Sequence, residues 1–113
     1  MRPALRGEVW IVDLGLAAKV RPAVVLSIPP NDTERALVTL VPHTTSLRGS
    51  RFEVETKVGF LKPGAFDAQG IVTIPFARLV RAIGQLKPHD LAAVEHAVCA
   101  WLGIVRRETG GVG

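Results

Sequence analysis

Short runs of β-branched and other apolar residues, separated by turn-forming residues, fill this chain up to residue 86. Glu8 to Leu14 alternates polar and apolar residues, and Val20 to Ser27 contains a solid Val and Leu run. Such runs favour strands, and the Gly, Pro, Asn and Asp clusters between them favour turns. Further strands are expected at Ala36 to Pro42, Arg51 to Thr56, Ala65 to Ile74 (one long strand, or a strand broken around Gly70) and Arg81 to Leu86. Many short strands in a small chain predict a barrel or a strongly curved sheet.

One helix is expected after the last strand. Pro88 suits a first helical turn, and Asp90 complements the positive N-terminal end of a helix. Apolar residues then recur on one helical face, which we expect to pack on the sheet: Leu91, Val94, Val98, Trp101 and Leu102. Gly103 weakens or ends this helix. The chain is therefore expected to be a single domain over residues 1–105, followed by a flexible tail at 106–113.

The composition limits the possible function classes. The 113 residues are 48% hydrophobic, which is enough for one core without disulfides. The formal charge of +4 suits an anionic partner such as RNA, DNA or an acidic protein segment. The single Cys99 excludes an internal disulfide and a cysteine-cluster zinc site, and the histidines lack metal-ligand spacing. With no signal peptide and no run of transmembrane length, we expect a cytoplasmic protein without membrane, metal or cofactor.

A cation and several hydroxyls flank two of the expected strands. Pro22 cannot donate to a sheet ladder and biases Arg21 toward an extended conformation, so the guanidinium is held at the strand entry. Thr44, Thr45 and Ser46 follow the exit of the next strand. If these two strands pair antiparallel, the cation lies beside the hydroxyls, and both can bind one phosphate. With no carboxylate pair expected here, such a site suits metal-free phosphoryl chemistry, in which an RNA 2'-OH is the nucleophile.

Several segments follow one another in a characteristic order over residues 6 to 104. They are Arg6-Gly7-Glu8-Val9-Trp10, Val12-Asp13-Leu14, Arg21 to Ser27, Val41-Pro42-His43-Thr44, Gly59-Phe60-Leu61-Lys62, Gln69, Thr73-Ile74, Arg78-Leu79 and Ile83-Gly84-Gln85-Leu86. In this order the chain resembles the MazF/PemK family of toxin endoribonucleases from toxin–antitoxin systems. The resemblance implies a small SH3-like barrel of the CcdB/MazF type that forms a homodimer. It also implies metal-independent cleavage of single-stranded RNA at short sequences, 2',3'-cyclic phosphate ends and neutralisation by a cognate antitoxin.

The resemblance also assigns roles to residues. Arg21 matches the family arginine that contacts the scissile phosphate, and Thr44 matches the threonine at that phosphate. His43 is a candidate general base because histidine titrates near neutral pH, although strand alternation could aim it away from Thr44. The candidate RNA contacts are Lys19, Thr45, Ser46, Arg48, Arg51 and Gln69.

Two departures from the family pattern leave the acid–base chemistry open. The link Gly15 to Lys19 has no carboxylate, and Phe66 and Ala68 stand where some members carry an arginine and an acid. Asp67 is one residue away and should point to the other face of its strand. These departures are compatible with a different acid–base arrangement, a weak enzyme or an inactive relative.

Simpler roles and other functions are also compatible with these residues. Arg21 could form an ion pair with Asp13 or Glu8. Thr44 could cap its own loop with a local hydrogen bond. Two alternatives to a ribonuclease are a non-catalytic binding barrel and a gyrase-poisoning toxin. The second arises because Trp101-Leu102-Gly103-Ile104 is superficially similar to the Trp-Gly-Ile end of CcdB-type toxins, although it carries an inserted Leu and is not terminal.

Overall fold

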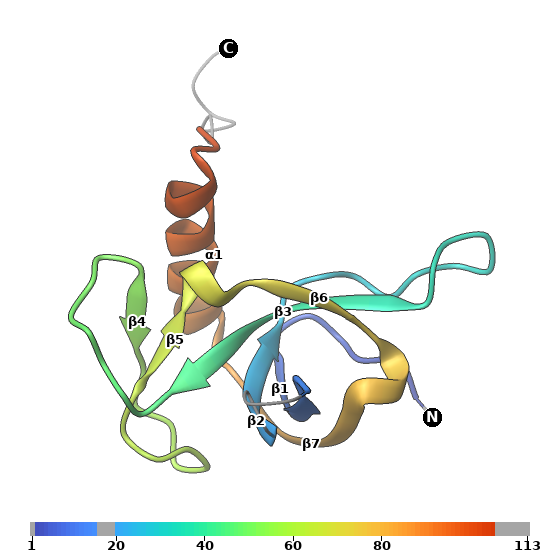
Figure 1. Cartoon of the computed structure of the whole chain (residues 1–113), viewed down its shortest axis with the longest axis horizontal. Helices are drawn as coiled ribbons and strands as arrows, with labels where there is room; N and C mark the ends of the chain where they lie inside the picture. Colours follow the sequence, from blue (N-terminus) through green and yellow to red (C-terminus); the bar gives the residue numbers. More distant parts are fainter. Residues whose placement is uncertain (1, 16–19, 106–113) are drawn as a thin grey trace.

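The computed structural model describes residues 2–15 and 20–105 (Figure 1). Their elements are β1 (Glu8–Asp13), β2 (Val20–Val25), β3 (Leu37–Thr44), β4 (Glu53–Glu55), β5 (Ala65–Asp67), η2 (Ala68–Gly70), β6 (Val72–Pro75), η3 (Phe76–Arg78), β7 (Leu79–Gln85) and α1 (Pro88–Leu102). The expected order of many short strands followed by one helix is confirmed.

The strands form one antiparallel sheet in the order β4-β5-β3-β2-β1-β7, and β6 pairs with β3 beside this path. β3 is the organising strand because it pairs with β6 through its first half, with β2 in the middle and with β5 at its end. In Figure 1, β3 crosses the molecule from β6 to β5. A strand that changes partners along its length curves the sheet, so the predicted small barrel with a C-terminal helix is confirmed.

Alternate residues of the strands build two hydrophobic clusters, one on each face of the sheet. Val9, Val24 and Val41 face the cluster that α1 completes, together with the fully buried Phe66. The residues between them in sequence face the second cluster, whose buried members are Ala4, Trp10, Val12, Ala23, Val25, Val38, Leu40, Ile74 and Leu79. This period of two assigns each side chain near the β2–β3 junction to a definite face.

The strand that contains His43 and Thr44 ends later than predicted. β3 extends to Thr44 because His43 and Thr44 pair with Phe66 and Ala65 of β5. These two residues therefore lie within the strand, although the expected strand ended at Pro42. The segment from Ala65 onward is broken, as the alternative reading allowed, and η2 separates β5 from β6.

α1 spans the predicted region, and Gly103 ends it in a left-handed conformation with φ of 72°. Val94 and Val98 are buried as predicted. Trp101 and Leu102 are 43% and 51% exposed, so the prediction is wrong for the end of the stripe. Figure 1 gives the reason, because the C-terminal turns of α1 extend beyond the strands.

No helix of the described residues combines the length and apolarity needed to cross a membrane. The predicted tail at 106–113 lies outside those residues.

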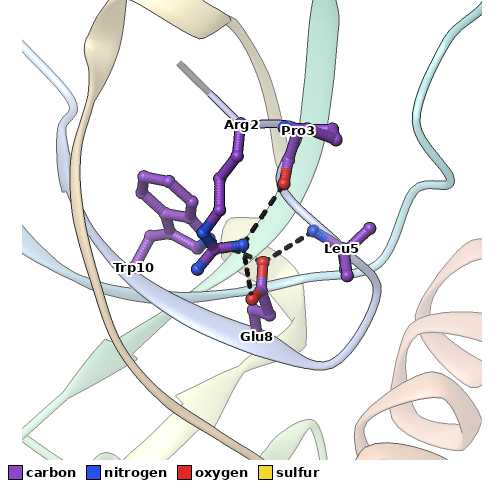
Figure 2. Close-up of polar contacts among 5 residues, drawn as sticks. All are labelled: Arg2, Pro3, Leu5, Glu8 and Trp10. Atoms are coloured by element: carbon purple, nitrogen blue, oxygen red, sulfur yellow. Dashed lines mark hydrogen bonds and ion pairs between the residues drawn. The ribbon is translucent and has the colours of Figure 1, made fainter.

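Glu8 ties the N-terminal segment to the sheet (Figure 2). Its carboxylate accepts hydrogen bonds from Leu5 N–H at 2.7 Å, the Arg2 guanidinium at 2.8 Å and Trp10 Nε1–H at 3.2 Å. Burial alone would raise the pKa of Glu8, but these donors together hold it below its usual value. Glu8 is thus an ion-pair partner of Arg2, and the alternative that it pairs with Arg21 is wrong.

Candidate functional site

The ends of β2 and β3 separate at a pair of prolines. The two strands pair from Val25 to Ala23, and Ala23 faces Pro42. Carrying this register two residues further places Arg21 opposite Thr44, on the same face of the sheet. Beyond Pro42, β3 pairs with β5. In addition, neither Pro22 nor Pro42 has an N–H that could donate a hydrogen bond between β2 and β3. The strand ends are therefore free to open around the cation and the hydroxyl.

A pocket of about 150 Å³ lies at this opening, and we call it the small pocket. It is lined by Arg21, Pro42, Thr44, Ser46, Arg48, Glu53 and Asp67. The Nε of Arg21 is buried and has no hydrogen-bond partner within residues 2–15 and 20–105. An unsatisfied buried donor costs about 1–3 kcal/mol, so an acceptor on a bound molecule is favourable here. The two acidic residues considered as partners of Arg21 have other partners. The carboxylate of Glu8 binds Arg2, and that of Asp13 accepts a hydrogen bond from Gly15 N–H.

The hydroxyl of Thr44 is held in place by the loop that follows it. Ser46 N–H donates to Thr44 Oγ1 at 3.0 Å, which confirms the local cap. A hydroxyl also carries a proton of its own, and the only described acceptor near it is Ser46 O at a long 3.5 Å. Capping the loop therefore leaves Thr44 able to donate to a ligand beside Arg21.

The β3–β4 loop is fixed by the carboxylate of Glu53. This carboxylate accepts the backbone N–H groups of Arg48 at 3.0 Å, Gly49 at 2.7 Å and Ser50 at 3.1 Å. The hydrogen bond from Arg48 N–H has the largest effect and lowers the pKa of Glu53. Desolvation acts in the opposite direction, but the N–H groups of Gly49 and Ser50 lower the pKa further, so it stays below its usual value. The same loop brings Ser46 and Arg48 to the small pocket.

A second pocket of about 670 Å³, which we call the large pocket, adjoins the first. Arg21, Thr44 and Ser46 line both pockets. His43 belongs to the large pocket and lies on the opposite face of β3 from Thr44. Its side chain is 4% exposed, and its Nε2 has no hydrogen-bond partner in the described chain. Burial lowers the pKa of His43, so the imidazole is neutral near pH 7.

Comparison with known proteins agrees with this geometry. The family model described as "PemK-like, MazF-like toxin of type II toxin-antitoxin system" matches residues 5–102. The chain belongs to this family of toxins.

Solved structures whose names give an endoribonuclease or MazF share the fold. An endoribonuclease in complex with its cognate antitoxin from a mycobacterial species is 25% identical over 91% of this chain and 98% of its own, with a TM-score of 0.77. The Mycobacterium tuberculosis toxin MazF-mt6 is 27% identical over 93% and 100%, with a TM-score of 0.74. A MazE–MazF structure from Deinococcus radiodurans is 20% identical over 93% of this chain and 100% of its own, with a TM-score of 0.78. At this identity the likeness supports a shared fold and nothing more.

The remaining candidate residues of this MazF-like toxin are spread more widely. Thr45 is exposed and lines the large pocket. Arg51 lies over the ring of Phe52, with 4.6 Å between its Cζ and the ring centroid, and lines neither pocket. Gln69 is exposed on η2 and also lines neither. Lys19 lies outside the described residues.

Sequence reasoning missed two carboxylates of the small pocket, Glu53 and Asp67. The signal for Asp67 was available in the alternation of its strand. Phe66 and Ala68 are fully buried in the cluster under α1, so Asp67 points to the other face, which is the face of Arg21. The expectation that no carboxylate pair accompanies the cation and hydroxyls is therefore wrong.

Proposed function

We propose that this toxin is a sequence-specific endoribonuclease that cleaves single-stranded RNA without a metal ion. The observation that carries the proposal is the buried, unpartnered Arg21 Nε beside the Thr44 hydroxyl in a pocket of about 150 Å³. Family membership and the similar toxins named as endoribonucleases support it. The cation and the hydroxyl match the charge and the acceptor oxygens of a phosphodiester.

The reaction that fits these groups is an internal transesterification. The RNA 2'-oxygen attacks the adjacent phosphorus, the bond from phosphorus to the 5'-oxygen breaks, and a 2',3'-cyclic phosphate and a 5'-hydroxyl result. Negative charge develops on the non-bridging oxygens, where the Arg21 guanidinium and the Thr44 O–H stabilise it. The 2'-OH proton must pass to a base, and a proton must reach the leaving 5'-oxygen.

Asp67 is our candidate for the base. Glu53 is occupied by three backbone N–H groups, whereas Asp67 uses Oδ1 for Gln69 N–H at 3.1 Å and retains Oδ2 as an acceptor. Asp67 also lines the pocket of Arg21 and Thr44. His43 fits this role less well because it lies on the other face of β3 and its Nε2 is shielded from solvent.

The partners proposed for this chain are RNA, a cognate antitoxin and a second copy of the chain, in the cytoplasm. The antitoxin is supported by the similar toxins whose structures contain one. The net charge of +4 favours an acidic antitoxin segment that covers the basic pockets. The homodimer follows from the family resemblance.

The test is RNA cleavage in excess EDTA by wild type, Arg21→Ala, Thr44→Val and Asp67→Asn, with the cut ends mapped. Loss of one preorganised donor typically slows a reaction about 10²–10³-fold, and we expect that loss for Arg21→Ala. Asp67→Asn keeps the shape of the side chain but removes a basic carboxylate, so it should slow cleavage as well. Arg35→Ala, in the distant β2–β3 connection, is the matched control. Intact RNA with folded, antitoxin-free wild type, or an unchanged rate for Arg21→Ala, would contradict the proposal and favour a non-catalytic binding barrel.

A further inference from the structure

A further pocket lies on the β4–β5 loop, and we call it the loop pocket. Its volume is about 670 Å³, and it is lined by residues of this loop together with Glu55 at the end of β4. Leu61 and Lys62 line both the loop pocket and the large pocket. The large pocket, which contains Arg21, therefore adjoins another hollow at Lys62.

The series of pockets continues toward α1 with one that we call the helix pocket. It has a volume of about 350 Å³ and is lined by Glu55, Thr56, Lys57, Lys87, His89 and Asp90. Glu55, Thr56 and Lys57 also line the loop pocket. Each pocket from the small pocket to the helix pocket thus shares lining residues with the next one. Together they form a groove that leads from the candidate phosphate site to the first turn of α1.

This groove carries a lysine at each of its outer junctions. Lys62 lies between the large pocket and the loop pocket, Lys57 lies between the loop pocket and the helix pocket, and Lys87 lies at the far end. All three side chains are exposed, and none forms an ion pair with a carboxylate of residues 2–15 or 20–105. A lysine ammonium is a point charge on a flexible stem, so a row of unpaired lysines suits a row of anions.

Two carboxylates in the outer groove oppose this positive charge. Asp90 lies in the helix pocket, where one of its oxygens is 3.2 Å from His89 Nε2. Glu55 lines both outer pockets and forms no ion pair within the described part of the chain. The excess of positive charge is therefore modest, as suits a contact that adds affinity without fixing a sequence.

We propose that this groove holds one single-stranded flank of the RNA beyond the cleaved bond, and that Lys62, Lys57 and Lys87 contact its phosphates. This inference rests on the proposed RNA substrate. A nucleic-acid strand presents a phosphate at every nucleotide, and contacts to phosphates supply affinity and position while carrying no sequence information. An acidic protein segment is the other polyanion to consider. The RNA backbone is favoured because the groove is continuous with the pockets that Arg21 lines.

The first experiment measures binding to non-cleavable 2'-O-methyl RNAs that are lengthened one nucleotide at a time at either end. We expect affinity to rise as one of the two ends is lengthened, and to level off once the groove is filled. On the longest RNA, Lys57→Gln should make the slope of log K against log salt concentration shallower by about 0.7, because one phosphate contact is lost. On the shortest RNA the slope should not change. Arg35→Gln, in the distant β2–β3 connection, is the control and should leave both slopes as in wild type.

The second experiment uses a variant with the opposite expected effect. Glu55→Gln removes the carboxylate that borders both outer pockets, so it should tighten binding of the longest RNA and change that of the shortest RNA little. Glu55 and Lys57 are both exposed, so neither variant should disturb the fold.

The outcomes separate this inference from the proposed catalysis. If length increases affinity through Lys57 but wild type does not cleave RNA, the inference stands and only the catalysis is lost. Affinity that is independent of RNA length, or an equal effect of Lys57→Gln on short and long RNAs, overturns the inference even where cleavage is observed. The groove would then be left to an acidic protein segment. Failure to bind RNA of any length overturns the inference and the RNA substrate together.

Discussion

At the scale of single residues, Glu8 is expected to make stability depend on pH. In the folded state the pKa of Glu8 lies below its ordinary value of 4.5. The contribution of the charged carboxylate to stability is therefore fully present at pH values above 4.5. As the pH falls below it, the unfolded chain binds the proton first, and the contribution disappears as the pH passes the lowered pKa. We expect Glu8→Gln to lower the free energy of unfolding by about 2 kcal/mol near neutral pH, and by progressively less in acid.

Urea unfolding between roughly pH 3 and pH 7 measures this difference. Glu55→Gln, at an exposed position, is the matched control and should change little. A cost of Glu8→Gln that stays constant over the whole range would show that the carboxylate charge is not what stabilises the N-terminal segment.

Single residues also show how far the sequence alone predicts the site. Arg21 and Thr44 are brought together as expected because local register, set by the strands between them, fixes their positions. The place of Asp67 depends on β5 pairing with the end of β3, a contact that no local pattern encodes. The sequence therefore predicts the cation, the hydroxyl and the face on which Asp67 lies. The place of Asp67 beside them, the carboxylate of Glu53 and the shielded nitrogen of His43 become visible only in three dimensions.

At the scale of elements, the β3–β4 loop depends on one carboxylate. Its Arg48, Gly49 and Ser50 N–H groups all converge on Glu53. Glu53→Gln keeps an oxygen acceptor but removes the charge, so these amides should exchange with solvent several-fold faster while those of β1 are unchanged. Hydrogen exchange read by NMR measures this. Unchanged protection of the three amides in Glu53→Gln would mean that other contacts hold the loop.

Elements also differ in how well their patterns predict them. β1 and α1 are found close to their expected bounds because alternation and helical spacing are local properties of the sequence. β3 is longer than predicted because its last two residues gain a partner in β5, more than twenty positions further along the chain. The exposed Trp101 has the opposite cause, since its helical face continues past the end of the sheet that would cover it.

At the scale of the whole molecule, part of the net charge of +4 is concentrated where RNA would bind. Arg48 lines the small pocket, Lys62 and Arg81 line the large one, and Arg21 lines both, whereas the carboxylates of Glu53 and Asp67 lie only in the small pocket. Each phosphate neutralised on single-stranded RNA contributes about −0.7 to the slope of log K against log salt concentration. We expect Arg81→Gln to weaken binding and to make this slope shallower by about 0.7, because one contact is lost.

The measurement is fluorescence anisotropy with a short, non-cleavable RNA over roughly 50–200 mM salt. Arg35→Gln removes the same charge from the β2–β3 connection, which Figure 1 places at the opposite end of the molecule from β4 and β5. If net charge alone governed binding, the two variants would shift affinity and slope equally. Because a direct phosphate contact acts only where the strand lies, the slope should change for Arg81→Gln and remain that of wild type for Arg35→Gln. Equal slopes for both variants would place the RNA path elsewhere.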